Sequence, residues 1–256
     1  MIEAHSLESL INKVSEDLPR KILGTKHVPI ENNHLEYVVG FDMSKSNRFR
    51  RVNFEKIRTS KLIGILFCRP NSPIAGSEIL GDLTYFHFRS GESIDFFCAG
   101  YGAYWPPEKF PGQIPVAKVA NVDWFFSAKS YIDLENELEA ETCWKPNGEA
   151  ELILIMAHKG SDNKVTLDYQ SAVVCRLEQM IRDKAITSAR AFFESIFISS
   201  KDNGADTTWG FSDRKGIEIG KSTLKEAILS LLPKSIAKGY KRTEHFVVQN
   251  ISKKAG

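Results

Sequence analysis

The chain has 256 residues, of which 42% are hydrophobic and 26% are charged, with a formal net charge of +2. This composition is ordinary for a soluble globular protein, and the longest apolar runs, 62–68 and 152–157, are too short to span a bilayer. The N-terminus lacks the basic and apolar regions of a secretory signal, and the four cysteines are widely spaced without a CxxC motif. We therefore expect a reduced, cytoplasmic protein without a membrane segment.

The first third of the chain combines a helical pattern with a strand pattern and a basic stretch. Apolar residues recur at helical spacing across 6–18, with Ser6 as the N-cap and Pro19 as the breaker, which predicts an amphipathic helix. The run 35–42 is typical of a strand. The basic stretch 45–61 follows, and we expect it to be partly helical.

The middle of the chain alternates apolar runs with helical segments. The run 62–68 is typical of a strand that is covered on both faces, and 93–100 and 150–157 predict two more buried strands. Residues 75–90 fit either a helix or a hairpin strand, and we favour the helix. A proline-rich loop and an acidic helix over 127–142 would separate the last two strands. This alternation predicts an α/β fold with a mostly parallel sheet flanked by helices.

The strongest periodic signal in the chain follows Thr166. Apolar residues recur at steps of three and four as far as Phe197, which predicts a helix over 167–198 of about 45 Å, at about 1.5 Å per residue. The helix could break near 186–190, or it could extend past the domain, where its stripe would suit docking to another protein or to a second copy of the chain. The residues that would carry this contact are Leu177, Met180, Phe192 and Phe193.

A turn-rich segment at 201–206 is the best candidate for a domain boundary. It would separate an α/β core domain, residues 1–200, from a small α+β appendage over 207–256. From position 214 onward the sequence has ten Lys or Arg against three Glu, a balance that suits contact with nucleic-acid phosphates. A second basic segment, 20–60, has nine Lys or Arg against four acidic residues, and both segments also fit solvated surface.

Ligands of parallel α/β sheets bind beyond the C-terminal ends of the strands. Three loops, 69–77, 98–112 and 158–163, would meet there and could hold a nucleotide-like or other anionic small molecule. An arginine can grip a phosphate, aromatic rings can stack on a base, and a histidine can act as a general base. Each of these residues also fits a turn, a surface ion pair or packing. The candidate ligand-binding residues are Arg69, Asn71, Ser72, Tyr101, Trp105, His158 and Lys159, with His158 as the one catalytic candidate.

Dedicated catalytic signatures are missing from the sequence. It has no Walker A or GxGxxG spacing, no nucleophile elbow and no paired zinc-ligand spacing, so neither a cofactor nor a metal is assigned and catalysis stays open. We therefore expect an interaction subunit of a protein assembly that docks through 167–198. The alternatives are an enzyme or sensor for an anionic small molecule and, third, a nucleic-acid-binding protein that uses its basic C-terminal region.

Overall fold

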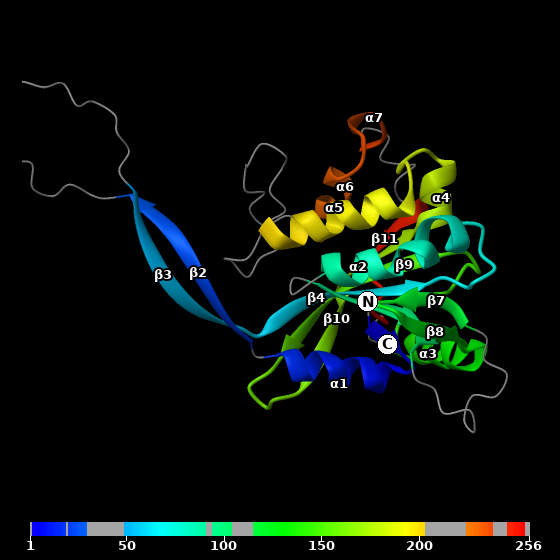
Figure 1. Ribbon diagram of the computed structural model, residues 1–256, viewed down its shortest axis with the longest axis horizontal. Coiled ribbons are helices and arrows are strands. Elements are labelled where there is room, and N and C mark those ends of the chain that lie inside the picture. Colours follow the sequence, from blue (N-terminus) through cyan, green and yellow to red (C-terminus); the bar gives the residue numbers. More distant parts are fainter. Residues whose placement is uncertain are drawn as a thin grey trace, which may run out of the picture.

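The protein consists of a body, built on a six-stranded sheet with helices on both faces, and a two-stranded arm that projects from one end of that sheet (Figure 1). None of the helices within the described part of the chain is long and apolar enough to cross a membrane. The computed structural model describes residues 2–18, 20–29, 49–90, 94–103, 115–202, 224–237 and 245–253.

The central sheet is mixed, with the strand order β1-β5-β4-β9-β10-β11. Its strands are β1 (Ile2–Ala4), β4 (Ser60–Phe67), β5 (Ile94–Ala99), β9 (Glu151–Lys159), β10 (Val165–Arg176) and β11 (Val247–Gln249). The first three strands in that order are parallel, whereas β9, β10 and β11 each lie antiparallel to the strand before them. The α/β class is confirmed, but the expectation of a mostly parallel sheet is wrong. One reason is the tight turn from β9 to β10, because so short a connection joins only antiparallel strands.

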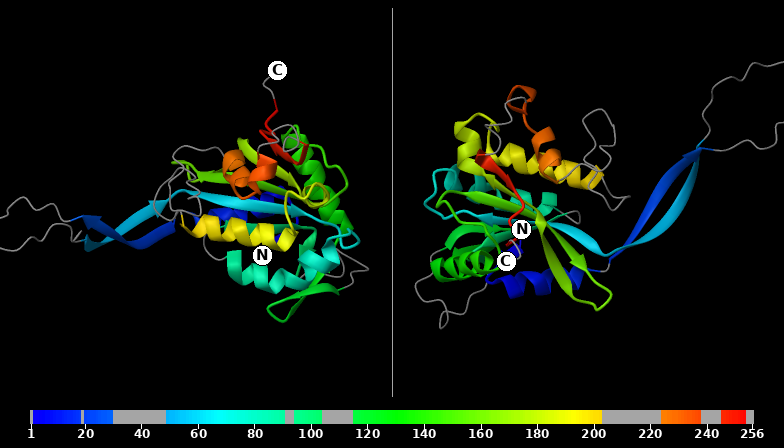
Figure 2. Two further views of the ribbon diagram at one scale, coloured as in Figure 1. Left: turned by 90° about the horizontal axis from the view of Figure 1, so that it is seen from above. Right: turned by 180° about the vertical axis from the view of Figure 1, so that it is seen from behind.

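Helices cover both faces of the sheet (Figures 1 and 2). On one side α1 (Leu7–Asp17) and α3 (Ala128–Glu141) pack on Ile63 and Ile65 of β4. On the other side α2 (Leu83–Ser90), α5 (Ala189–Asp202) and α6 (Leu224–Ser230) pack on Leu62 and Leu66. Every residue of β5 is buried, and so is every residue of β4 after the first. Two covered faces explain why these strands have continuous apolar runs.

Several predicted elements are confirmed. Helix α1 follows Ser6, whose hydroxyl accepts a hydrogen bond from the Ser9 N–H at 3.1 Å. The strands expected at 62–68, 93–100 and 150–157 correspond to β4, β5 and β9, and the acidic helix corresponds to α3. The ambiguous segment 75–90 is helical throughout: a π-helical turn (Ala75–Ile79) and a 3-10 turn (Leu80–Asp82) lead into α2.

The predicted helix over 167–198 is wrong. The chain stays in β10 as far as Arg176, α4 spans Leu177–Arg182, and α5 begins only at Ala189, after a turn in which Lys184 has a φ of 57°. The apolar steps of three and four arise because the buried end of a strand leads directly into a helix. The predicted partner-binding side chains of Leu177, Met180, Phe192 and Phe193 are at most 3% exposed. The sheet of the same chain covers the stripe that suggested a docking surface.

The arm consists of β2 (Arg20–Pro29) and β3 (Phe49–Arg58), which pair antiparallel over ten residues. It extends away from the body in every view (Figures 1 and 2). The helix expected within 45–61 is wrong for the ten residues of β3, and the strand expected at 35–42 lies outside the described residues. Within the described part of the chain, no third strand joins the arm.

The remaining elements complete the body. A small sheet has the strand order β6-β8-β7, with β6 (Tyr101–Gly102), β7 (Pro115–Val119) and β8 (Val122–Phe126). Most of the predicted boundary at 201–206 lies outside the described residues. Beyond it, α6 joins the core and β11 is the sixth strand of the central sheet, whereas α7 (Lys234–Ala237) is a single short turn.

Candidate functional site

The structure brings together two of the three loops that were expected to share a ligand. Parallel β4 and β5 end at the same edge, which we call the Cys68 end of the sheet, and there the Tyr101 hydroxyl donates a hydrogen bond to the Cys68 carbonyl at 2.7 Å. Strand β9 runs the other way, so His158 pairs with Ser60 at the start of β4. His158 and Lys159 therefore lie at the opposite end, which we call the arm end. Trp105 lies outside the described residues.

At the Cys68 end, the predicted ligand residues contact other parts of the body. The Arg69 guanidinium lies 4.7 Å from the centre of the Tyr131 ring, and its Nη2 is 3.9 Å from a carboxylate oxygen of Glu135. This places a cation over an aromatic face beside an acid, both on α3. Tyr101 is 2% exposed, whereas Asn71 is exposed. Arg69 is thus engaged on two sides while nearly half of its side chain stays in solvent.

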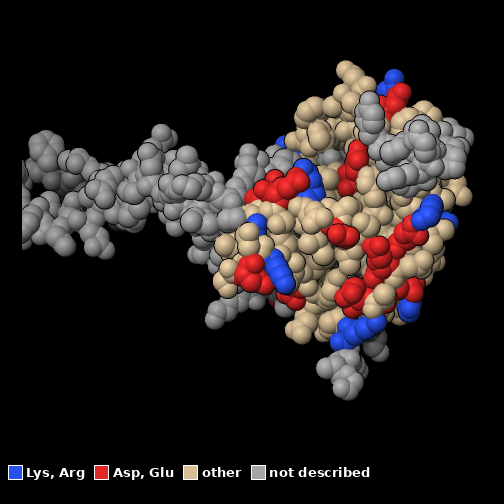
Figure 3. All heavy atoms as spheres, turned by 90° about the horizontal axis from the view of Figure 1, so that it is seen from below, with Lys and Arg blue, Asp and Glu red and all other residues tan. Residues whose placement is uncertain are grey.

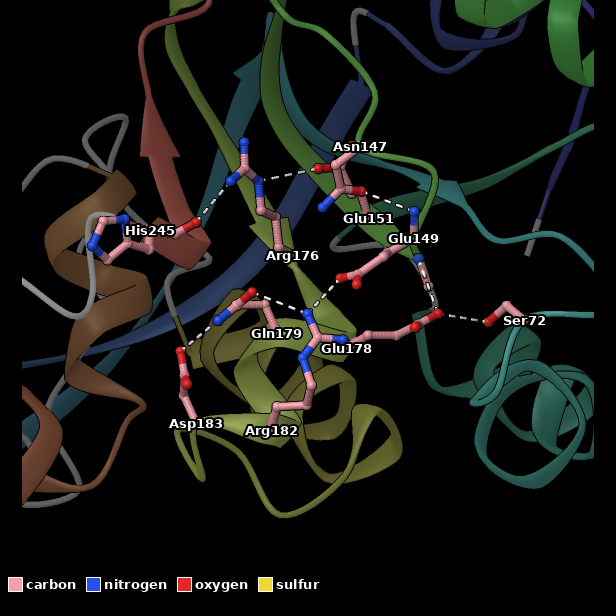
Figure 4. Close-up of polar contacts among 11 residues, drawn as sticks. Ser72, Asn147, Glu149, Glu151, Arg176, Glu178, Gln179, Arg182, Asp183 and His245 are labelled. Carbon is pink, nitrogen blue, oxygen red and sulfur yellow. Dashed lines mark hydrogen bonds and ion pairs between the residues drawn. The ribbon is translucent and has the colours of Figure 1, made fainter.

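A carboxylate of the chain fills the place expected for an anion. Glu178 lies in the first turn of α4, and its Oε1 accepts hydrogen bonds from the Ser72 hydroxyl at 3.0 Å and the Ala150 N–H at 3.2 Å (Figure 4). These contacts join the loop after β4, the start of β9 and α4. A bound phosphate would need the same donors. Since Glu178 is buried, its carboxylate occupies these donors from within the body.

A second buried carboxylate, Glu151, lies in the same cluster at the first residue of β9 (Figure 4). It accepts a hydrogen bond from the Trp144 indole at 3.1 Å and lies 3.4 Å from Nε of Arg176. Burial raises its pKa to about 7, although the Trp144 hydrogen bond and the Arg176 charge act in the opposite direction. Such a pKa suits a general acid or base. However, the side chain is only 1% exposed, so no substrate can reach it in this conformation.

The thiols at this end are also enclosed. Burial raises the pKa of Cys68 to about 11 and that of Cys98 to about 12, which keeps both protonated near neutral pH. The apolar crevice beside them has no room for a water molecule. The Cys68 end is therefore a packed junction in the described part of the chain.

An open hollow of about 590 Å³ lies elsewhere, between β1, α2 and the turn from β7 to β8. Glu3 lines it and accepts hydrogen bonds from the Ala103 N–H at 2.7 Å and from His5 at 3.2 Å. His87 and Trp124 are also part of the lining. None of the predicted ligand residues that the structure describes lines this hollow.

The arm end is built around a buried lysine. Lys61, the second residue of β4, is 3% exposed, and its ammonium lies 2.6 Å from Asp95 at the start of β5 and 2.7 Å from Asp17 at the end of α1. Asp95 is 5% exposed, and burial raises its pKa despite the neighbouring ammonium. This ion-paired group connects three elements directly beside the root of the arm.

Lys159, a predicted ligand residue, holds the root of the arm instead. Its backbone N–H donates to the carbonyl of Thr59, the single residue between β3 and β4, at 2.8 Å. Its ammonium donates to the carbonyls of Ser15 at 3.0 Å and Leu18 at 2.6 Å, at the C-terminal end of α1. A cation is favourable at this end of a helix dipole. The neighbouring His158 is exposed on the other face of β9.

Comparison with known proteins adds no relative: no family model, no curated protein and no solved structure matches the chain. The described residues also contain no group of three or more His, Cys, Asp or Glu side chains that could hold a metal ion.

Sequence reasoning missed the carboxylates at the Cys68 end and both strands of the arm. A signal existed for each: Glu151 opens an apolar run, Glu178 interrupts an apolar stripe, and β-branched or aromatic residues are spread along 20–29 and 49–58.

Proposed function

We propose that the protein is a binding module whose contact element is the β2–β3 arm, and whose body holds that arm in position. One observation carries the proposal: within the described residues, the arm is a two-stranded sheet paired only with itself. An isolated two-stranded ribbon is marginally stable in water, and its unpaired edges can associate with another molecule. A partner that binds the arm would supply the stability that the body does not.

The contacts at the arm end support this role. Lys61 connects α1, β4 and β5 beside the arm, and Lys159 ties α1 to the residue that joins β3 to β4. A root held in this way limits the orientations of the arm, so less entropy is lost when a partner binds. The expected class of function, an interaction subunit, is kept in this proposal. The proposed partner-binding element is the arm in place of 167–198, which packs in the core.

The alternative of a small anionic ligand at the Cys68 end has less support. The donors of Ser72 and Ala150 bind Glu178, Arg69 lies over Tyr131, and Glu151 is enclosed. A ligand at this end would have to displace the carboxylate of Glu178 before it could use the same donors.

An arm-deleted variant tests the proposal. Arg20 and Arg58 are directly paired, so the two roots are about 5 Å apart and Asn-Gly can replace residues 20–58 as a tight turn. We expect the variant to keep the melting temperature of the body within a few degrees and to lose partners that the full chain retains. The measurement is parallel affinity capture from cell extract, with quantification of bound protein and nucleic acid. Equal capture by both chains, or an unfolded variant, would contradict the proposal.

A further inference from the structure

The register of the arm separates its charges onto two different faces. Paired residues of an antiparallel ribbon share a face, and successive residues of a strand alternate between faces. One face, which we call the basic face, therefore has five cationic positions and no acidic one: Arg20, Lys26, Arg50, Lys56 and Arg58. The opposite face includes Glu55 and has only two Lys or Arg positions, Lys21 and Arg51, besides His27.

The excess of basic residues in the arm contrasts with the slight acidic excess in the rest of the chain. The two strands contain seven Lys or Arg and one Glu, whereas the whole chain has 34 and 32, so the remainder has 27 basic residues against 31 acidic ones. On the body, acidic side chains gather over the face that α1 and α3 cover (Figure 3). Helix α3 has five acidic residues, at 133, 135, 137, 139 and 141, against one lysine. A polyanion would be attracted by the arm and repelled by this side of the body.

We propose that the partner of the arm is double-stranded DNA and that the basic face contacts its phosphates, a step that rests on the proposed function. Cationic positions occur from the root, at Arg20 and Arg58, to the outer part of the arm, at Lys26 and Arg50. Ten strand residues at about 3.3 Å each span about 33 Å, close to one turn of B-DNA. The phosphates of a duplex offer a continuous line of negative charge over that length.

The shape of the arm favours a B-form duplex over other polyanions. The major groove of B-DNA is wide enough to admit a two-stranded ribbon, whereas the major groove of an RNA duplex is deep and narrow. A ribbon in the groove lies close to the phosphates on both sides. The interaction needs no base contact, so the inference concerns DNA as a polymer rather than a particular sequence.

The test uses the full chain and two matched double variants. Arg50→Gln/Lys56→Gln removes two charges from the basic face, and Lys21→Gln/Arg51→Gln removes two from the opposite face, so their net charges are equal. The probe is a fluorescent DNA duplex of about 24 base pairs, roughly two turns, titrated by anisotropy at several salt concentrations. Melting temperatures check that each variant is folded.

We expect the basic-face variant to lose at least tenfold in affinity and its opposite-face control less than threefold. The slope of log K against log salt should decrease by about 2 for the former, because each lost phosphate contact changes it by about 0.9. Equal losses in the two variants would overturn the role of the basic face. Equal binding of an RNA duplex would overturn the groove argument.

Two further results separate this inference from the function on which it rests. If the duplex does not bind but polyglutamate does, and only when the arm is present, then the arm is a contact element and DNA is the wrong partner. If the arm-deleted chain binds the duplex as well as the full chain does, both proposals fail. Binding of the duplex that is lost with the arm and weakened through the basic face supports both.

Discussion

The two ends of the central sheet use buried charge in opposite ways. At the Cys68 end, the buried carboxylate of Glu178 accepts hydrogen bonds from neutral donors and fills the space that a ligand would need. At the arm end, Asp17 and Asp95 neutralise Lys61, and the resulting group fixes the elements from which the arm extends. The edge where parallel strands end is therefore closed here. The edge where they begin supports the part of the molecule that reaches outward.

The largest loss of stability is expected from Lys61→Met, which would remove the buried ion pairs at the arm end. The substitution leaves the carboxylate of Asp95 buried without its cation, and a broken buried ion pair destabilises a protein by about 3–5 kcal/mol. Urea unfolding measures the loss. Lys129→Met is the matched control, because Lys129 forms an exposed pair with Asp133 that is worth less than about 1 kcal/mol. Similar small losses in both variants would show that the buried pair does not hold this end together.

A pH-dependent effect on the order of 3 kcal/mol is expected from Glu151 at the Cys68 end. Its pKa rises from an ordinary 4.5 to about 7 in the folded chain, so burial favours the neutral form. The stability that this group contributes is present below about pH 4.5 and is lost as the pH rises through about 7. Glu151→Gln keeps the hydrogen bond from Trp144 and cannot ionise. The free energy of unfolding of Glu151→Gln should therefore increase relative to that of wild type as the pH rises.

Unfolding in urea at about pH 5 and about pH 8 measures this change. The exposed Glu141→Gln serves as the control, since it removes an acidic group without altering the buried cluster. If the free energies of unfolding of wild type and Glu151→Gln change equally over this pH range, Glu151 titrates as it does in the unfolded chain. The Cys68 end would then be less enclosed than its burial implies.

The sequence predicts the elements of this fold better than their directions. Local periodicity was enough for α1, β4, β5, α3 and β9, because apolar spacing depends on which side of an element is buried. Strand direction depends on connections and neighbours, so the antiparallel course of β9 could not be read from its apolar run. That one reversal moves His158 and Lys159 to the arm end and divides the predicted site.

The two wrong helix predictions have different causes. Over 167–198, Val173 and Val174 belong to a buried strand, and the helical residues that follow continue the same apolar stripe. The possible break near 186–190 agrees with the start of α5 at Ala189, but no signal separates β10 from α4. In β3, four of the seven positions between Phe49 and Ile57 are charged, three of them basic, which obscures the strand pattern. The pairing of β3 with β2 across a gap of 19 residues is a tertiary contact that local propensity cannot express.

The smallest predicted effect tests whether the carboxylate of Glu178 is what closes the Cys68 end. Glu178→Ala leaves the Ser72 hydroxyl and the Ala150 N–H without their acceptor, at a cost of about 2 kcal/mol. It also vacates a space that is lined by hydrogen-bond donors. If an internal carboxylate is what closes the Cys68 end, sulfate should bind in that space and raise the melting temperature of Glu178→Ala more than that of wild type.

The control is Glu149→Ala, which removes a carboxylate from the same cluster, where it pairs with Arg182 at 2.9 Å, without freeing those donors. Sulfate should affect this variant no more than it affects wild type. If sulfate instead stabilises wild type as much as Glu178→Ala, the Cys68 end already binds anions with Glu178 in place. The small-molecule alternative would then gain support, and the contrast between a closed end and an arm-bearing end would no longer hold.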